Sequence, residues 1–187
     1  SHGEQDCRAG LRVPLCVSYL AACAKIFPAS ILELGTGGDS AHSTGMFLYW
    51  LDLFYRWVDG PTTSLISVDR HYLSHAWLRY RENKNWTFIQ GDSVQVMKQI
   101  RAGNITIPVD EFDLIFIDSS HLYKETLAEI HQASLMTDAM LFDDSTVPDV
   151  KRAIDEYTAG HPDWLRVDVH PGVTLLERHE RQRLPAP

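Results

Sequence analysis

Four residues in the C-terminal half of the sequence have types and spacing suited to chemistry: Asp118, His121, Asp143 and Asp144. Asp118 and the Asp143-Asp144 pair each come directly after a short apolar run, and His121 follows Asp118 by three positions. Carboxylate oxygens suit a hard divalent ion such as Mg²⁺. An imidazole, with an unperturbed pKa of about 6.5, accepts protons near neutral pH. The alternative is structural, because Asp143-Asp144-Ser145 could cap a following helix.

The apolar runs indicate how these residues come together. A short continuous apolar run predicts a strand buried on both faces, as in a parallel sheet. Ligands bind outside the carboxyl ends of such strands. Clustered carboxylates at that edge require cations or hydrogen-bond donors. Five successive predicted strands end in acidic residues, which are Glu33, Asp69, Asp92, Asp118 and Asp143.

The rest of the chain alternates predicted strands and helices, which implies βαβ units and a parallel sheet. A turn at Pro171-Gly172 predicts a closing hairpin. The fold class is therefore α/β, a Rossmann-like, doubly wound, mostly parallel sheet with a C-terminal antiparallel hairpin. We expect one domain over residues 1–187 with a short N-terminal helical leader. The predicted strands are 31–34, 65–68, 86–89, 114–117, 139–142, 164–169 and 173–177, and the predicted helices are 11–26, 46–57, 73–82, 93–102, 122–135 and 147–158.

A glycine-rich loop follows the first predicted strand in the segment Glu33-Leu34-Gly35-Thr36-Gly37. Glycines there let the backbone turn tightly and approach a ligand, although many α/β turns also contain two glycines. Asp69 ends the second strand, where a carboxylate can accept hydrogen bonds from ribose hydroxyls. Asp92 and Ser93 follow the third strand, and their alternative role is to cap the next helix.

These motifs resemble those of the class I S-adenosylmethionine-dependent methyltransferases, and the resemblance runs from about residue 11 onward. It implies a seven-stranded sheet with one reversed strand. One departure is Asp39, which stands where the family commonly has a third glycine, so the contacts of loop 38–44 are not predicted. The cofactor-binding residues implied by the resemblance are Glu33, Gly35, Thr36, Gly37, Asp69, Asp92 and Ser93.

The pattern of Asp118-x-x-His121 followed by Asp143-Asp144 closely resembles the metal-dependent O-methyltransferases of small molecules, methyltransferase family 24 in particular. The resemblance implies that Asp118, Asp143 and Asp144 bind Mg²⁺ or another divalent cation. It implies His121 as the general base, with Asp118 as the alternative base. The implied reaction is methyl transfer to a hydroxyl of a sugar, polyketide or catechol-like acceptor. Catechol-type enzymes have a lysine near this point, so their mechanism is not transferred whole.

Composition narrows the function classes. The net charge of −8 argues against a broad nucleic-acid surface. No apolar stretch approaches the ~20 residues that span a bilayer, and the first residues lack a charged-then-apolar signal-peptide pattern, so we expect a cytoplasmic protein with neither nucleic-acid nor membrane partners. The three cysteines lack a C-x-x-C pair, which favours buried packing over a disulfide framework or zinc site.

Two other function classes stay open at this point. A nicotinamide-dependent oxidoreductase would also use a glycine-rich loop and Asp69, although a regular G-x-G-x-x-G is missing. A non-catalytic binding protein could keep the same fold. The aromatic segment 47–57 predicts core packing or, alternatively, a homo-oligomer interface or a wall of the acceptor pocket.

Overall fold

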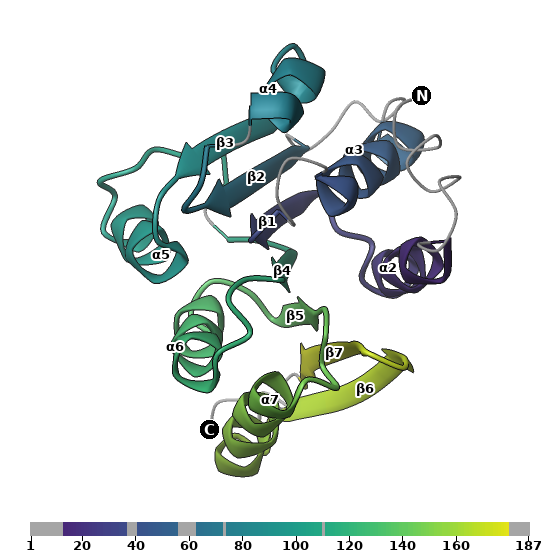
Figure 1. Cartoon of the computed structure of the whole chain (residues 1–187), viewed down its shortest axis with the longest axis vertical. Coiled ribbons are helices and arrows are strands. Elements are labelled where there is room, and N and C mark those ends of the chain that lie inside the picture. The colour runs from purple at the N-terminus through teal and green to yellow at the C-terminus, as the bar shows by residue number, and fades with distance from the viewer. Residues whose placement is uncertain (1–12, 37–40, 56–62, 73, 110, 180–187) are drawn as a thin grey trace, which may run out of the picture.

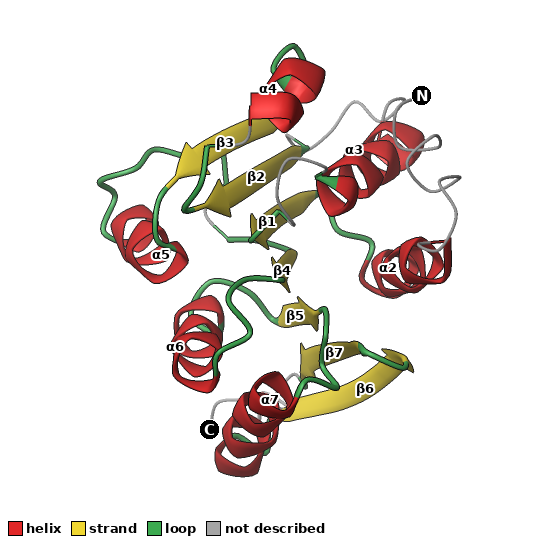
Figure 2. Ribbon diagram, viewed as in Figure 1, coloured by secondary structure: helices red, strands yellow, loops and turns green. Residues whose placement is uncertain are grey.

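The computed structural model describes residues 13–36, 41–55, 63–72, 74–109 and 111–179. Within these residues a seven-stranded sheet lies between two layers of helices (Figures 1 and 2). The strands are β1 (Ser30–Leu34), β2 (Ser64–Asp69), β3 (Trp86–Gln90), β4 (Leu114–Ile117), β5 (Ala139–Phe142), β6 (Trp164–His170) and β7 (Val173–Arg178). The helices are α2 (Val13–Ile26), α3 (His42–Tyr55), α4 (Ser74–Tyr80), α5 (Ser93–Arg101), α6 (Tyr123–Ala133) and α7 (Pro148–Gly160).

The strand order is β3-β2-β1-β4-β5-β7-β6, and it confirms the predicted sheet. Strands β1 to β5 are parallel to one another, whereas β7 runs antiparallel to both β5 and β6. The chain builds outward from β1 to β3 and then restarts on the other side of β1 with β4. The carboxyl ends of β1 and β4 therefore flank the topological switch point, where open α/β sheets bind ligands.

Two apolar cores lie on the two faces of the sheet. Helices α2, α3 and α4 pack on one face, and α5, α6 and α7 pack on the other (Figure 1). Strand β4 supplies both cores, because Phe116 faces the first and Ile117 faces the second. All four residues of β4 are buried, which explains why the strand has a continuous apolar sequence.

Helix α3 contains most of the aromatic segment singled out in the sequence. Phe47, Trp50 and Leu51 are buried, which confirms core packing for this part of the helix. Leu53 and Phe54 are exposed. The last two positions of the segment, 56 and 57, lie outside the described residues.

Two further predictions concern the helices. Cys16 and Cys23 on α2 are buried and form no disulfide within the described residues, as the packing interpretation predicted, and Cys7 lies outside the described residues. Among the described helices, none combines the length and the apolar character needed to cross a membrane.

Candidate active site

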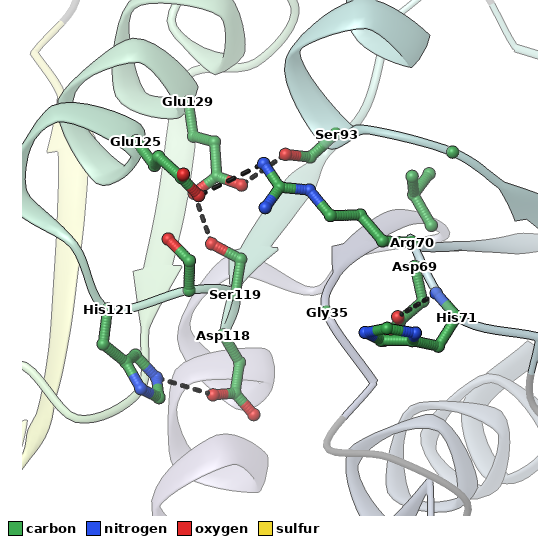
Figure 3. A pocket seen from close by; sticks show the side chains of 13 residues that line it. Gly35, Asp69, Arg70, His71, Ser93, Asp118, Ser119, His121, Glu125 and Glu129 are labelled. Atoms are coloured by element: carbon green, nitrogen blue, oxygen red, sulfur yellow. Dashed lines mark hydrogen bonds and ion pairs between the residues drawn. The ribbon is translucent and has the colours of Figure 1, made fainter.

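A cleft of about 330 Å³ lies at the carboxyl ends of β1 to β4 and is bordered by α6 (Figure 3). It lies where the strand ends and the topological switch point predicted a ligand site. Its walls come from the ends of β1, β2 and β3 on one side and from residues 118–129 on the other. Five of the residues predicted from the sequence line it, and these are Gly35, Asp69, Ser93, Asp118 and His121.

Gly35 lies at the closest approach between the two sides of the cleft. Its φ is +78°, and a Cβ built on it would lie 1.9 Å from the carbonyl oxygen of Asp118. An L side chain fits neither the backbone conformation nor the space. The glycine at this position therefore lets the loop after β1 pack against the turn after β4.

Asp69 holds the glycine-rich loop in place. Its Oδ2 accepts hydrogen bonds from the backbone N–H of Thr36 at 3.1 Å and from the Thr36 hydroxyl at 3.0 Å. Its Oδ1 accepts from the N–H of His71 at 2.8 Å. Thr36 is buried and outside the lining of the cleft, so it acts through Asp69. Gly37, also predicted to bind cofactor, lies outside the described residues.

Glu33 has a different place from the one expected. Its carboxylate is fully buried and accepts hydroxyl hydrogen bonds from Ser43 at 2.5 Å, Thr44 at 2.7 Å and Ser67 at 2.5 Å. It is not part of the cleft lining. Burial raises the pKa of Glu33 to about 7, although the three hydroxyls act in the opposite direction. In this structure Glu33 ties β1 to β2 and to the start of α3.

Asp92 caps α5, as the structural alternative predicted, by accepting a hydrogen bond from the N–H of Gln95 at 3.0 Å. It also accepts one from Arg70 at 2.7 Å, and Arg70 lies 3.2 Å from a Glu125 oxygen on α6. Burial acts to raise the pKa of Asp92, but the hydrogen bond and charge of Arg70, together with the backbone N–H groups of Gln95 and Val94, outweigh it and lower that pKa. Arg70 thus connects the β2 end with α5 and α6 beside the cleft (Figure 3).

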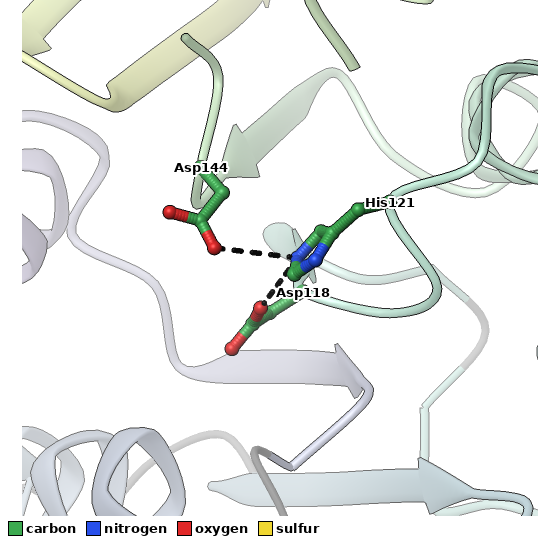
Figure 4. A group of neighbouring side chains, drawn as sticks. All are labelled: Asp118, His121 and Asp144. Atoms are coloured by element: carbon green, nitrogen blue, oxygen red, sulfur yellow. Dashed lines mark hydrogen bonds and ion pairs between the residues drawn. The ribbon is translucent and has the colours of Figure 1, made fainter. Parts of the chain in front are cut away.

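His121 lies between two carboxylates at the other side of the sheet edge (Figure 4). Its Nε2 is 3.2 Å from Oδ1 of Asp118 and 3.5 Å from Oδ2 of Asp144. One potential ligand atom from each of the three residues lies within 4.8 Å of the others. This group contains Asp118 and Asp144 of the predicted metal triad, with His121 as its third member.

The backbone at this cluster is unusual. His121 has φ 57° and Asp144 has φ 50°, a left-handed conformation that non-glycine residues rarely adopt. Such strain concentrates at functional sites, where surrounding structure maintains it. Asp144 does not cap α7, because that helix begins after Val147 without a side-chain capping bond. The capping alternative therefore does not account for Asp144.

Asp143 is held by Tyr19 of α2, whose phenol hydroxyl donates a hydrogen bond to it. Burial raises the pKa of Asp143 and, with the neighbouring carboxylates, that of Asp118. The hydrogen bond to Asp118 raises the pKa of His121. These directions describe a pocket in which negative charge is costly unless a positive charge balances it.

Sequence reasoning missed four residues at this edge, two on predicted helices and two in the loops that follow predicted strands. Glu129 of α6 is 2% exposed and lies beside Thr126, Ile130 and Ala133 on the buried face of that helix. A carboxylate on the apolar face of an amphipathic helix is a signal that the sequence contained. The other three missed residues, which carry no such signal, are Tyr19, Arg70 and Ser119.

Comparison with protein families supplies the identification. A family model described as a methyltransferase domain, family 24, matches residues 32–145, which is more than half of the chain. The chain belongs to this methyltransferase-domain family. The match begins inside β1 and ends one residue beyond Asp144, so it contains every site residue predicted from the sequence. The class I methyltransferase resemblance is thereby confirmed.

Solved structures share the fold. A TDP-rhamnose 3'-O-methyltransferase of calicheamicin biosynthesis, CalS11, has a TM-score of 0.67 and 15% identity, over 89% of this chain and 79% of that one. An O-methyltransferase from Bacillus cereus in complex with SAH has a TM-score of 0.60 and 19% identity, over 88% and 81%. MycE of mycinamycin biosynthesis, in complex with Mg and SAH, has a TM-score of 0.57 and 14% identity, over 84% and 47%. Among curated proteins, no sequence matches.

Proposed function

We propose that this methyltransferase moves the methyl group of S-adenosylmethionine to a hydroxyl oxygen of a small hydroxylated molecule, with the help of a divalent cation. The observation that carries the proposal is the cluster of Asp118, His121 and Asp144 at the same sheet edge as the cleft beside Gly35 and Asp69. An electrophile held at the cleft and an acceptor held at the cluster would meet at the end of β4. The proposal treats residues 1–187 as one domain.

The donor groups at the cluster fit a divalent cation. Asp118 and Asp144 offer carboxylate oxygens close together, and Asp143 lies near enough to contribute to the raised pKa of Asp118. Carboxylate oxygens are the ligands that Mg²⁺ and Mn²⁺ prefer. We therefore assign Asp118, Asp143 and Asp144 as the ligands. A bound cation would lower the pKa of an acceptor hydroxyl by Lewis acidity.

On the cofactor side, the proposal assigns Gly35, Gly37, Asp69, Asp92 and Ser93 to S-adenosylmethionine, with Thr36 acting through Asp69. Asp69 keeps acceptor capacity for ribose hydroxyls while it holds Thr36 and His71. Glu33 would act indirectly, by fixing the strand from which the loop starts. The complexes named for the Bacillus cereus enzyme and for MycE support this choice of cofactor, and MycE also supports magnesium.

His121 is the proposed base, and its contacts indicate which nitrogen would act. A carboxylate only accepts hydrogen bonds, so the neutral imidazole presents Nε2–H to Asp118 and has its lone pair on Nδ1. Nδ1 would take the proton of the acceptor hydroxyl. The oxygen then forms its bond to the methyl carbon, the carbon–sulfur bond breaks, and its electron pair leaves with sulfur as S-adenosylhomocysteine. The protein would mainly align the reactants.

The acceptor class follows from the proposed cation. Adjacent hydroxyls, as in sugars and catechols, would offer two oxygens to such a cation, and CalS11 is named for a rhamnose 3'-hydroxyl. A nucleotide-linked sugar or a sugar attached to a polyketide is our first choice. The family membership favours methyl transfer over nicotinamide chemistry.

The first test is calorimetric titration of S-adenosylhomocysteine into chelator-treated protein, repeated with Mg²⁺. We expect binding in the micromolar range in both conditions. Screening of polyhydroxylated acceptors with S-adenosylmethionine and Mg²⁺ then follows. No binding with or without Mg²⁺ would reject the proposed activity and favour a non-catalytic role for the fold.

The second test separates the base from the cofactor site. His121→Ala is expected to retain affinity for S-adenosylhomocysteine and to lose turnover by about 10²-fold or more, as removal of a general base does. His131→Ala is the matched control, because His131 lies at the far end of α6 against Tyr157. Equal turnover of the two variants would remove His121 from the mechanism.

A further inference from the structure

Glu129 is a buried carboxylate that joins the two walls of the cleft. It is on α6, is 2% exposed and is part of the cleft lining. Its Oε1 accepts a hydrogen bond from the Ser93 hydroxyl, and its Oε2 accepts one from the Ser119 hydroxyl at 2.6 Å. Figure 3 shows Ser93, at the start of α5, and Ser119, in the turn after β4, approaching this carboxylate. One side chain of α6 therefore contacts both α5 and the turn after β4.

The two hydroxyls belong to different parts of the proposed site. Ser93 is the first residue of α5, next to Asp92 at the end of β3, on the cofactor side. Ser119 directly follows Asp118 and stands two residues before His121, on the metal and base side. The turn that contains Ser119 ends in the left-handed backbone of His121. A turn in this conformation needs support from its surroundings.

Burial of the Glu129 carboxylate is unfavourable, and packing alone does not require a carboxylate at this position. A buried carboxylate forgoes its hydration, and apolar residues of similar volume commonly stabilise such positions as well or better. Burial raises the pKa of Glu129, whereas the two serine hydroxyls act to lower it. A buried carboxylate that does not stabilise the fold, but contacts both sides of a cleft, fits a role in positioning those two sides.

We propose that Glu129 is a positioning residue that holds the Ser93 side and the Ser119 side of the site in register, so that the cofactor and the Asp118–His121 turn face one another. This inference rests on the proposed function. In this proposal Glu129 itself contacts neither the cofactor nor the cation. The Ser93 arm fixes the cofactor wall, and the Ser119 arm fixes the turn that presents Asp118 and His121.

The test uses two binding probes, so it needs no knowledge of the acceptor. S-adenosylhomocysteine is titrated by calorimetry, and Mn²⁺ is titrated by electron paramagnetic resonance as a probe of the acidic cluster. Glu129→Leu is expected to weaken both affinities by about tenfold or more, the range that a hydrogen bond to a charged group is worth. Ser93→Ala should weaken only S-adenosylhomocysteine binding, and Ser119→Ala should weaken only Mn²⁺ binding.

Two further variants control for stability. Glu129→Gln keeps the shape and part of the hydrogen bonding, so it should recover a large part of both affinities. Glu156→Leu is the matched control, because Glu156 is an exposed glutamate on α7 that accepts the Tyr123 hydroxyl outside the cleft. We expect it to change neither affinity. The melting temperature of Glu129→Leu should equal or exceed that of the wild type.

Three outcomes decide the inference. Affinities of Glu129→Leu within twofold of the wild type would overturn it, and so would a Ser119→Ala variant that weakens both probes equally. If the wild-type protein binds no S-adenosylhomocysteine, the proposed function fails first. Hydrogen exchange at the amides of 91–93 and 118–122 then tests the same connection without a ligand, and unchanged exchange in Glu129→Leu would reject it.

Discussion

The acidic edge of the sheet has two halves that treat their carboxylates differently. In the β1–β3 half, which contains Glu33, Asp69 and Asp92, each carboxylate accepts two or more hydrogen bonds from nearby groups. In the β4–β5 half, which contains Asp118, Asp143 and Asp144, the described donors to the carboxylates are a single imidazole, a single phenol and the backbone N–H of Asp144.

The β1–β3 carboxylates serve to stabilise the fold, whereas the β4–β5 carboxylates are available for chemistry. The β1–β3 carboxylates are occupied with holding loops and helix starts, although the three hydroxyls at Glu33 offset only part of the burial that raises its pKa. The β4–β5 carboxylates have spare acceptor capacity, raised pKa values at Asp118 and Asp143, and left-handed backbone at two positions. Carboxylate oxygens that accept few hydrogen bonds and lie on strained backbone remain available to bind a cation.

The contact between the halves should give the largest effect. Gly35→Ala introduces a Cβ at 1.9 Å from the Asp118 carbonyl oxygen and strains a residue with φ +78°. We expect it to lower the free energy of unfolding by about 3 kcal/mol or more, from left-handed strain and overpacking together. Urea denaturation measures the loss, and calorimetry should detect no binding of S-adenosylhomocysteine.

Gly103→Ala is the matched control for that variant. Gly103 also has positive φ, +73°, but no atom lies within 4 Å of its added Cβ. The loss there should be about 1–2 kcal/mol, the cost of the left-handed conformation alone. Equal losses at the two glycines would show that the close approach of the halves is unimportant.

Removing one negative charge from the β4–β5 half should weaken metal binding and leave cofactor binding unchanged. Asp144→Asn is expected to weaken Mn²⁺ binding by about tenfold or more, because the charge of the ligand set governs affinity. Affinity for S-adenosylhomocysteine should stay within twofold of the wild type. Asp149→Asn, at the exposed start of α7, provides the control. A parallel loss of both affinities would contradict the separation between the halves.

A carboxylate of the β1–β3 half should make the free energy of unfolding depend on pH. The folded-state pKa of Glu33 is about 7, above its ordinary value of 4.5. A raised pKa means that the folded state binds the proton more tightly, so this contribution is full below pH 4.5 and is lost as the pH rises to about 7. The wild type should therefore lose about 3 kcal/mol relative to Glu33→Gln across this window.

Denaturant unfolding at a series of pH values measures that difference directly. Glu82→Gln is the control for the charge change, because the Glu82 side chain is 90% exposed. A difference between wild type and Glu33→Gln that is constant with pH would place Glu33 outside this linkage.

The smallest effect is expected at Arg70. Its ion pairs with Asp92 and Glu125 are half exposed, so Arg70→Gln should cost less than about 1 kcal/mol in stability. The cost should shrink at about 1 M salt, where charges are screened over a few ångströms. A larger or salt-independent loss, measured by urea denaturation, would mean that Arg70 stabilises the β1–β3 half by packing.

The sequence was sufficient for the fold because the apolar runs, helices and turns are regular. Strands such as 114–117 and 139–142 were predicted with the bounds that β4 and β5 have. The strand-end carboxylates also follow from the pattern, since parallel strands end at one edge. What they contact does not follow, because hydrogen bonds between distant segments depend on side-chain positions in three dimensions.

Three contacts illustrate that limit. Glu33 meets hydroxyls from α3 and β2, where the resemblance alone implied a cofactor contact. Tyr19 reaches Asp143 from a helix that the sequence analysis regarded as a leader. The need for Gly35 lies in the Asp118 backbone, more than eighty positions away in the chain. Each is a long-range contact that local periodicity does not encode.

The place of β7 between β5 and β6 has a consequence for synthesis of the chain. Residues 139–142 pair on one side with β4, but their other partner is 174–177, which emerges from the ribosome more than thirty residues later. Until then the apolar edge of β5 is an unpaired strand edge, the kind of surface that invites association between chains. Slow elongation across residues 143–173 would lengthen that exposure, so yield in the cell should depend on translation speed there.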